Sequence, residues 1–249
     1  MLARVPSRSP YQIMVRSLTP ACPGVALPRA DRFAVMASRD VAFVIHGAIL
    51  RSMNVAIRKR PITRQEFLSW AQAQGGRYEF DGIQPVAMTG GTIRHSQITQ
   101  NIHYALRTRL RGGSCRPLGP DAGLATIGQA VRYPDALVTC TKLPDTDYLV
   151  QGVVAVFEVL SPTSGQTDRI EKVREYRAVQ SIRRYVIVEH NSIGVTVFER
   201  ANADESWTAT TLTAGDILRM PEIGIEIPVS ELYESVDVSA AQGEASISA

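Results

Sequence analysis

Two carboxylates that stand in apolar runs are the residues of this sequence best suited to do chemistry. Asp135 directly precedes the apolar residues 136–138, and Glu158 interrupts the apolar run 153–160. A charged side chain seldom enters a buried strand unless it is paired or binds a metal. Lys172 follows fourteen residues after Glu158. If the two runs are neighbouring strands, the carboxylates form a cation site with an amine beside it. Such a site is suited to metal-dependent hydrolysis of phosphodiesters.

A structural role is the alternative for each of these residues. Asp135 follows Pro134 and could cap a turn by accepting hydrogen bonds from nearby backbone amides. Glu158 could form a buried ion pair with an arginine. Lys172 lies one helical turn after Asp168, so these two could form an ordinary pair on a helix surface. The residue types alone leave these alternatives open.

The basic character of the chain belongs to its N-terminal part. The formal net charge is +3, but residues 1–60 carry +8 and residues 61–249 carry −5. Residues 1–55 are rich in arginine and proline and lack periodicity. They predict a disordered basic extension, a transit-like leader, or a start upstream of the true one at Met36 or Met53. We expect one domain over 61–235 and a disordered tail over 236–249. Because this domain is mildly acidic, it should not offer a broad phosphate-binding surface.

The cysteines and the hydropathy pattern bear on the cellular compartment. Cys22, Cys115 and Cys140 are scattered and show no CxxC spacing, which argues against a disulfide framework and against a zinc site. The longest apolar stretch, 41–50, is too short to span a bilayer. The sequence therefore predicts a cytoplasmic protein with reduced cysteines.

Regular local signals begin at Pro61. Thr63 and Glu66 have capping-box spacing and open a predicted helix that ends at Ala73. A hairpin is expected at Asp81-Gly82. Further helices are expected over 95–110 and 168–179, and strands over 77–80, 83–88, 115–118, 123–126, 130–132, 184–189, 195–200, 207–213 and 217–218, besides the two carboxylate strands. The expected fold class is α+β, with a mixed central sheet flanked by helices.

Several short blocks occur together in an order that is typical of one family. They are Glu66-Phe67 with Trp70, Arg77-Tyr78-Glu79 with Asp81-Gly82, Met88, His95, Pro134-Asp135, Glu158-Val159-Leu160-Ser161-Pro162-Thr163-Ser164, Asp168, Lys172, Tyr176 and Tyr185-Val186-Ile187-Val188. Through these blocks, residues 61–234 resemble the Uma-two family of restriction-endonuclease-like proteins, a bacterial branch of the PD-(D/E)XK nuclease superfamily. The resemblance implies a restriction-endonuclease-like core and a Mg²⁺-dependent endonuclease that acts on DNA.

The resemblance also implies roles for individual residues. Asp135 and Glu158 would hold Mg²⁺, or Mn²⁺ in its place, with help from the backbone carbonyl of Val159. The superfamily name places a lysine two residues after the second carboxylate, where this chain has Leu160. Lys172 is then the candidate for the missing lysine, and its role would be to assist the attacking water.

Two observations bear on this assignment. The chain has only three lysines, Lys59, Lys142 and Lys172, and a lysine kept amid so many arginines is suited to act as a compact ammonium. Glu79 and His95 fall at family positions and are the remaining catalytic candidates. The spacing from Glu79 to Asp81 is one residue tighter than is usual for the family, which leaves open which of the two points at the metal.

Other classes of function remain possible from the sequence. The absent lysine at position 160 favours a nuclease-fold protein without catalysis that binds DNA or regulates. An interaction protein whose buried carboxylates pair with arginines is a third reading. We expect DNA as the partner, no membrane, and a homodimer, since cutting both strands usually needs two active sites.

Overall fold

The structure is a computed structural model that describes residues 60–160 and 167–238, all within the unit Arg58–Ala249. The predictions for residues 1–55 and for most of the tail lie outside the described residues. The helices are α1 (Arg64–Gln72), α2 (Ile93–Leu110) and α3 (Val173–Ala178), with a π-helical turn η1 (Thr167–Lys172) and a 3₁₀ turn η2 (Val229–Tyr233). The strands are β1 (Tyr78–Phe80), β2 (Pro85–Ala87), β3 (Arg116–Leu118), β4 (Leu124–Ala125), β5 (Val131–Arg132), β6 (Ala136–Thr139), β7 (Val153–Val159), β8 (Arg184–Val188), β9 (Val195–Glu199), β10 (Thr208–Leu212), β11 (Ile217–Met220) and β12 (Ile225–Pro228). No helix among these residues is long and apolar enough to cross a membrane.

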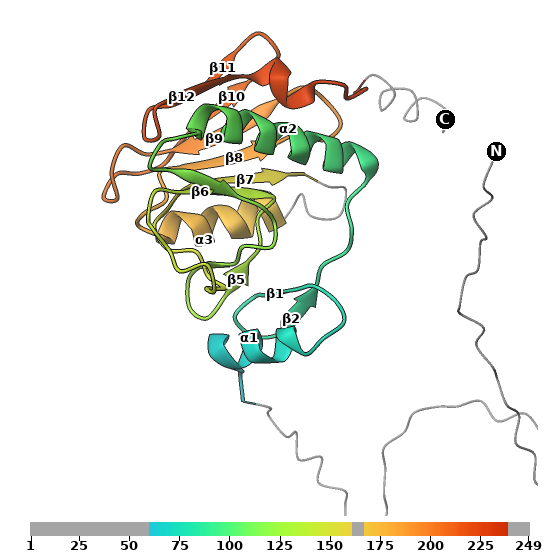
Figure 1. Cartoon of the computed structure of the whole chain (residues 1–249), viewed down its shortest axis with the longest axis vertical. Helices are drawn as coiled ribbons and strands as arrows, with labels where there is room; N and C mark the ends of the chain where they lie inside the picture. The colour runs from blue at the N-terminus through green and yellow to red at the C-terminus, as the bar shows by residue number, and fades with distance from the viewer. Residues whose placement is uncertain (1–59, 161–166, 239–249) are drawn as a thin grey trace, which may run out of the picture. The chain divides into compact units, whose positions relative to one another are not determined.

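A six-stranded mixed sheet forms the centre of the fold. Its strand order is β10-β9-β8-β7-β6-β3, and only the pair β7 and β8 is parallel. Helix α2 covers one face of the sheet and α3 covers the other (Figure 1). The expected α+β class with a mixed central sheet flanked by helices is confirmed.

Strand β7 is buried on both faces, which explains why its sequence is almost continuously apolar. Phe157 and Val159 point into the cluster that contains α2 and the β11–β12 hairpin. Val156 and Leu160 point into the cluster that contains Tyr176 of α3. Because side chains alternate along a strand, Glu158 faces the α3 side. The sheet therefore offers Glu158 a buried position that only a polar partner on that side can stabilise.

A second, four-stranded sheet of order β2-β1-β5-β4 packs with α1. The predicted capping box is present: the Thr63 side chain accepts from the Glu66 amide, and the Glu66 side chain accepts from the Thr63 amide. The predicted hairpin is also present, because Asp81 Oδ1 accepts from the amides of residues 83 and 84, both at 2.7 Å, and Gly82 takes a φ of 92°. These local contacts set the direction of β1, which carries Glu79.

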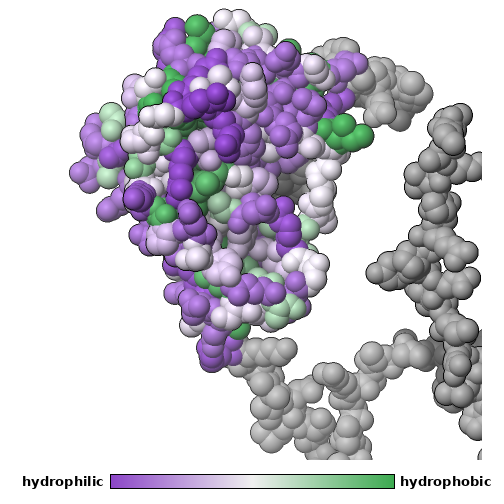
Figure 2. All heavy atoms as spheres, in the orientation of Figure 1, coloured by the Kyte–Doolittle hydropathy of each residue, from purple (hydrophilic) through white to green (hydrophobic). Residues whose placement is uncertain are grey.

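Several elements differ from expectation by a residue or more, and three of these differences bear on the site or the fold. Helix α2 begins at Ile93 rather than His95, because Thr92 acts as its N-cap and accepts from the His95 amide. The helix that contains Lys172 starts as the π-helical turn η1 before it becomes α3. Strand β12 was not predicted, although its four residues alternate fully between buried and exposed positions as a half-buried strand does. On the face drawn in Figure 2, hydrophobic residues lie singly among hydrophilic ones.

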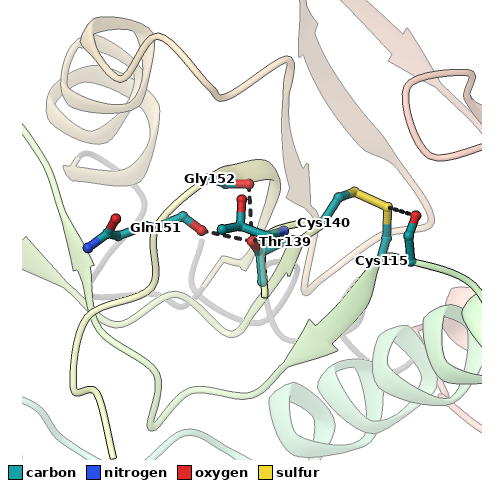
Figure 3. The surroundings of a disulfide bond; sticks show 7 residues. Cys115, Thr139, Cys140, Gln151 and Gly152 are labelled. Carbon is teal, nitrogen blue, oxygen red and sulfur yellow. Dashed lines mark hydrogen bonds between the residues drawn. A yellow bond between two sulfur atoms is a disulfide. The ribbon is translucent and has the colours of Figure 1, made fainter. Parts of the chain in front are cut away.

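The expectation of reduced, unpaired cysteines is wrong for two of the three. Cys115 and Cys140 form a disulfide, with their Cα atoms 3.9 Å apart (Figure 3). Strands β3 and β6 are antiparallel with Arg116 opposite Thr139, so the two cysteines are the next opposed pair. Sequence spacing could not reveal this pair, because the register of two strands brings it together. Cys22 lies outside the described residues.

Candidate active site

Strand register brings the two candidate carboxylates to the same place. Asp135 immediately precedes β6 and Glu158 lies in β7, and these antiparallel strands place Ala136 opposite Phe157. Continuing this register by one residue puts Asp135 opposite Glu158. The amide of Val159, the residue after Glu158, donates to the Asp135 carboxylate across the two strands. The two acids, distant in sequence, therefore lie on neighbouring strands at the same end of the sheet.

The Asp135 side chain is held by a neighbouring strand and approached by a histidine. Its Oδ2 atom accepts from the Val159 amide at 2.7 Å and lies 3.3 Å from His95 Nε2. Its backbone carbonyl accepts from His103 Nε2 at 2.9 Å. The alternative of a local turn cap is therefore replaced by a contact with the amide that follows Glu158. Helix α2 supplies both histidines, His95 in its first turn and His103 near its middle.

Glu158 is buried, with 4% of its surface exposed, and two donors converge on one of its oxygens. Oε1 accepts from Lys172 Nζ at 2.8 Å and from the Tyr176 hydroxyl at 2.7 Å. Burial, and then the negative charge of Glu158, raise the pKa of Tyr176 well above its usual value. The Tyr176 hydroxyl thus stays protonated and acts as a donor to the carboxylate. The partner of Glu158 among these contacts is a lysine and not the arginine that a structural role suggested.

Lys172 lies inside the protein rather than on a helix surface. Only 6% of its surface is exposed. Besides its bond to Glu158, its Nζ atom lies 3.9 Å from Glu79 Oε1. The end of η1 therefore points the ammonium between two carboxylates on two different sheets. The simple surface pair considered from the sequence does not describe this residue.

Glu79 is tied to a buried guanidinium. Its Oε2 atom accepts from Arg132 Nη1 at 3.1 Å, and its Oε1 atom accepts from the Tyr133 amide at 3.1 Å. Arg132 also donates to both oxygens of Glu175, at 2.8 and 2.6 Å. Burial lowers the pKa of Arg132, but the hydrogen bond to Glu175 and the charges of both glutamates outweigh it, so the net shift is upward. Arg132 therefore remains charged and fixes Glu79 beside Lys172. Asp81, the other candidate at this hairpin, uses its carboxylate to accept hydrogen bonds from the amides of the turn.

Three residues of this cluster were not found by sequence reasoning: Arg132, Glu175 and Tyr176 as a hydrogen-bond donor. Arg132 directly precedes the Tyr133-Pro134-Asp135 segment, and Tyr176 lies four residues after Lys172, which places it on the same helical face. Both positions could have been noticed as neighbours of a candidate. Their partners could not, because Glu175 lies 43 residues from Arg132.

The donor set can be compared with what a hard dication requires. Mg²⁺ prefers oxygen ligands and often binds through one or two carboxylates while it keeps several waters. Asp135, Glu158 and the Val159 carbonyl are oxygen donors of this kind. No group of three His, Cys, Asp or Glu side chains in the described parts of the chain is arranged to hold a metal ion. By donor type, Asp135, Glu158 and the Val159 carbonyl suit a dication that keeps most of its water ligands.

Comparisons with known proteins agree with this architecture. Residues 64–230 match the model of the family Uma2, described as "Putative restriction endonuclease". The uncharacterized protein slr1290 of Synechocystis sp. (strain ATCC 27184 / PCC 6803 / Kazusa) is 28% identical over 178 residues, which cover 70% of this chain and 93% of that protein. The uncharacterized protein sll1609 of the same organism is 21% identical over 164 residues, which cover 64% and 92% of the two chains.

A solved structure shares the fold. It is the crystal structure of a protein described as a putative nuclease belonging to DUF820 from Anabaena variabilis ATCC 29413. The TM-score is 0.56 at 14% identity, over 71% of this chain and 100% of that one. This likeness supports the restriction-endonuclease-like class of the fold. Since the family model covers most of the chain, the protein belongs to the Uma2 family of restriction-endonuclease-like proteins.

Proposed function

We propose that this protein is a Mg²⁺-dependent endonuclease that hydrolyses DNA phosphodiester bonds. The observation that carries the proposal is the contact between strands β6 and β7, where the Val159 amide holds the Asp135 carboxylate beside the residue that follows Glu158, with Lys172 Nζ 2.8 Å from Glu158. Two acids at the same end of the sheet can hold a metal ion, and a buried amine beside them can stabilise charge at the phosphate, as phosphodiester hydrolysis requires. Membership of the Uma2 family supports the same class of activity.

The carboxylates and the carbonyl of Val159 would hold the metal ion. When bound, Mg²⁺ supplies positive charge at the scissile phosphate and makes a water more acidic. Asp135 is pre-positioned for this task, because the Val159 amide fixes Oδ2. Glu158 is fixed by Tyr176, whose hydroxyl holds Oε1 in place. The chain thus orients both acids before any substrate arrives.

Lys172 and His95 would act on the substrate side of these acids. The Lys172 ammonium, held between Glu158 and Glu79, can orient the attacking water and stabilise negative charge on the phosphate. His95 Nε2, 3.3 Å from Asp135, can orient that carboxylate or donate to a phosphate oxygen. Glu79 acts by positioning Lys172, since its own oxygens are occupied by Arg132 and the Tyr133 amide.

A plasmid-cleavage assay tests the proposal. Wild-type protein should convert supercoiled DNA to nicked or linear forms with Mg²⁺ or Mn²⁺, and EDTA should stop the reaction. Asp135→Asn and Glu158→Gln should each lower the rate at least about 100-fold, the lower end of the effect of removing a charge that acts on the transition state. Asp145→Asn, whose carboxylate is 95% exposed, and Glu226→Gln, 60% exposed, are matched controls that should cut at the wild-type rate.

The same assay distinguishes the non-catalytic alternative. A DNA-binding protein without catalysis would cut nothing with either metal, and its DNA affinity would not change in Asp135→Asn or Glu158→Gln. Cleavage at equal rates by wild type and both site variants would contradict the proposed site. A homodimer remains part of the proposal, and sedimentation of the full chain with and without DNA measures it.

A further inference from the structure

A small cavity lies against α1 and the β1–β2 hairpin. Its volume is about 170 Å³, which suits one ring system rather than a large ligand. Three tyrosines line it, Tyr78 from β1, Tyr133 from the segment after β5, and Tyr148 from the loop before β7. Leu68 and Met88 complete its apolar wall. The proposed hydrolysis does not use this cavity.

The two charged side chains that line the cavity, Arg77 and Asp121, have opposite charges that cancel. Arg77 donates to the carbonyl of Pro120 and forms an ion pair of 3.3 Å with Asp121. A phosphate would have to compete with Asp121 for this guanidinium and would meet aromatic rings elsewhere. A neutral aromatic ring with polar edges fits better, because its faces can stack on tyrosines while Arg77 and Asp121 meet its acceptors and donors. Nucleobases have this chemistry.

The cavity is linked to the candidate site through the backbone. Tyr78 is adjacent to Glu79 in β1, with the Tyr78 ring on the α1 face and the Glu79 carboxylate on the opposite face. The Tyr133 amide donates to Glu79 Oε1 at 3.1 Å. Tyr133 also lies two residues before Asp135, so their Cα atoms are at most about 7.6 Å apart. Because Tyr133 and Asp135 are this close along the chain, a base in the cavity would belong to a nucleotide within a few residues of the bond that is cut.

We propose that this cavity binds one unpaired nucleobase of the substrate strand, next to the scissile phosphate. The inference rests on the proposed function and names its substrate class: a single strand, or a duplex from which one base has left the stack. A base within a duplex has both faces covered by its neighbours, so it can enter an aromatic cavity only after it unstacks. Stacking on aromatic side chains is tolerant of sequence, so the site selects the unpaired state more than the identity of the base.

Binding measurements on the full chain test this inference without cleavage. Fluorescence anisotropy in EDTA would follow a fluorescein-labelled single-stranded oligonucleotide and its fully paired duplex. Wild type should bind the single strand more tightly than the duplex. Tyr148→Ala should weaken binding of the single strand by about 5- to 150-fold, the range for loss of one stacked base. Tyr104→Ala is the matched control, because Tyr104 is 69% exposed on α2, Tyr148 is 59% exposed, and Tyr104 does not line the cavity.

A second measurement probes the same contact from the side of the DNA. Wild type is titrated with a series of oligonucleotides that each carry one abasic site. One position should bind as weakly as the Tyr148→Ala complex, and the loss at that position should disappear in Tyr148→Ala, because the two changes remove the same contact. A melting curve like that of wild type shows that Tyr148→Ala is folded.

The outcomes separate the inference from the proposed function. Equal affinity of wild type and Tyr148→Ala, or abasic sites without effect at every position, would overturn the nucleobase site even if the protein cuts DNA. A protein that shows the abasic effect but cuts no DNA would support the site and overturn the catalytic proposal.

Discussion

Replacement of Lys172 by methionine probes the centre of the candidate site. The change removes an ammonium that lies 2.8 Å from Glu158 and 3.9 Å from Glu79, and keeps a side chain of similar length. Loss of one partner from a buried ion pair costs about 3–5 kcal/mol, because the remaining charge stays buried. A domain of this size loses about 2–4 °C in Tm per kcal/mol. We therefore expect Lys172→Met to melt about 6–20 °C below wild type in differential scanning fluorimetry with EDTA.

A divalent metal should offset part of this loss. The ammonium and a dication both neutralise Glu158, so removing the ammonium leaves the carboxylate more available to the ion. Mn²⁺ should consequently raise the Tm of Lys172→Met more than that of wild type, by up to about 2.7 kcal/mol of added stability at one hundred times the dissociation constant. Cleavage should nevertheless fall by about 100- to 10,000-fold, the usual contribution of a positioned acid or base.

Lys142→Met is the control, because Lys142 is exposed and should change neither stability nor cleavage. If Lys172→Met melts with the wild type, the ion pair does not stabilise the fold as argued. If it melts lower but cuts at the wild-type rate, Lys172 is a structural residue.

The remaining predictions concern other contacts of the structure. Tyr176→Phe removes a hydrogen bond to a charged group and should lower stability by about 1.5–3 kcal/mol in urea unfolding. The raised pKa of Tyr176 keeps the wild-type hydroxyl protonated, so this loss should be the same at pH 6 and pH 9. Reduction of the disulfide between Cys115 and Cys140, whose separation is 25 residues, should lower stability by about 3.5 kcal/mol, and a Cys115→Ser/Cys140→Ser variant should not respond to a dithiol. Hydrogen bonds from Arg60 and Thr63 lower the pKa of Glu66 from 4.5 to about 2. Because this folded-state pKa is depressed, its stabilisation is present above pH 4.5 and lost as the pH falls towards 2, so Glu66→Gln should flatten the acid limb of a urea-unfolding series.

Each of these has a distinct contradicting result. A Tyr176→Phe loss that vanishes at pH 9 would show that the hydroxyl ionises. A melting temperature unaffected by dithiols would show that the cysteines are not bonded or that their loop contributes nothing. An unchanged acid limb in Glu66→Gln would show that the capping box forms without this carboxylate charge.

The elements whose signals are local were predictable from the sequence. The capping box at Thr63 and Glu66 and the turn at Asp81 involve groups within three residues of each other, so a short motif contains all the partners. The apolar repeat of α2 likewise predicts its buried face, including Ile98 and Ile102. The start of α2 was missed by two residues, because the first helical residue, Ile93, is exposed and lies outside the buried apolar repeat that begins at Ile98.

The sequence by itself determined which residues carry chemistry, because a carboxylate in an apolar run must find a polar partner. Asp135 and Glu158 stood out for this reason, and so did the scarce Lys172. Only the tertiary structure decided which groups those partners are. The register of β6 against β7 sets Asp135 opposite Glu158, the π-helical turn buries Lys172, and α3 brings Tyr176 to the same oxygen. Strand register and helix packing depend on the whole core. The sequence around one residue therefore does not reveal a partner far away in the chain, as for Arg132 with Glu175 and Cys115 with Cys140.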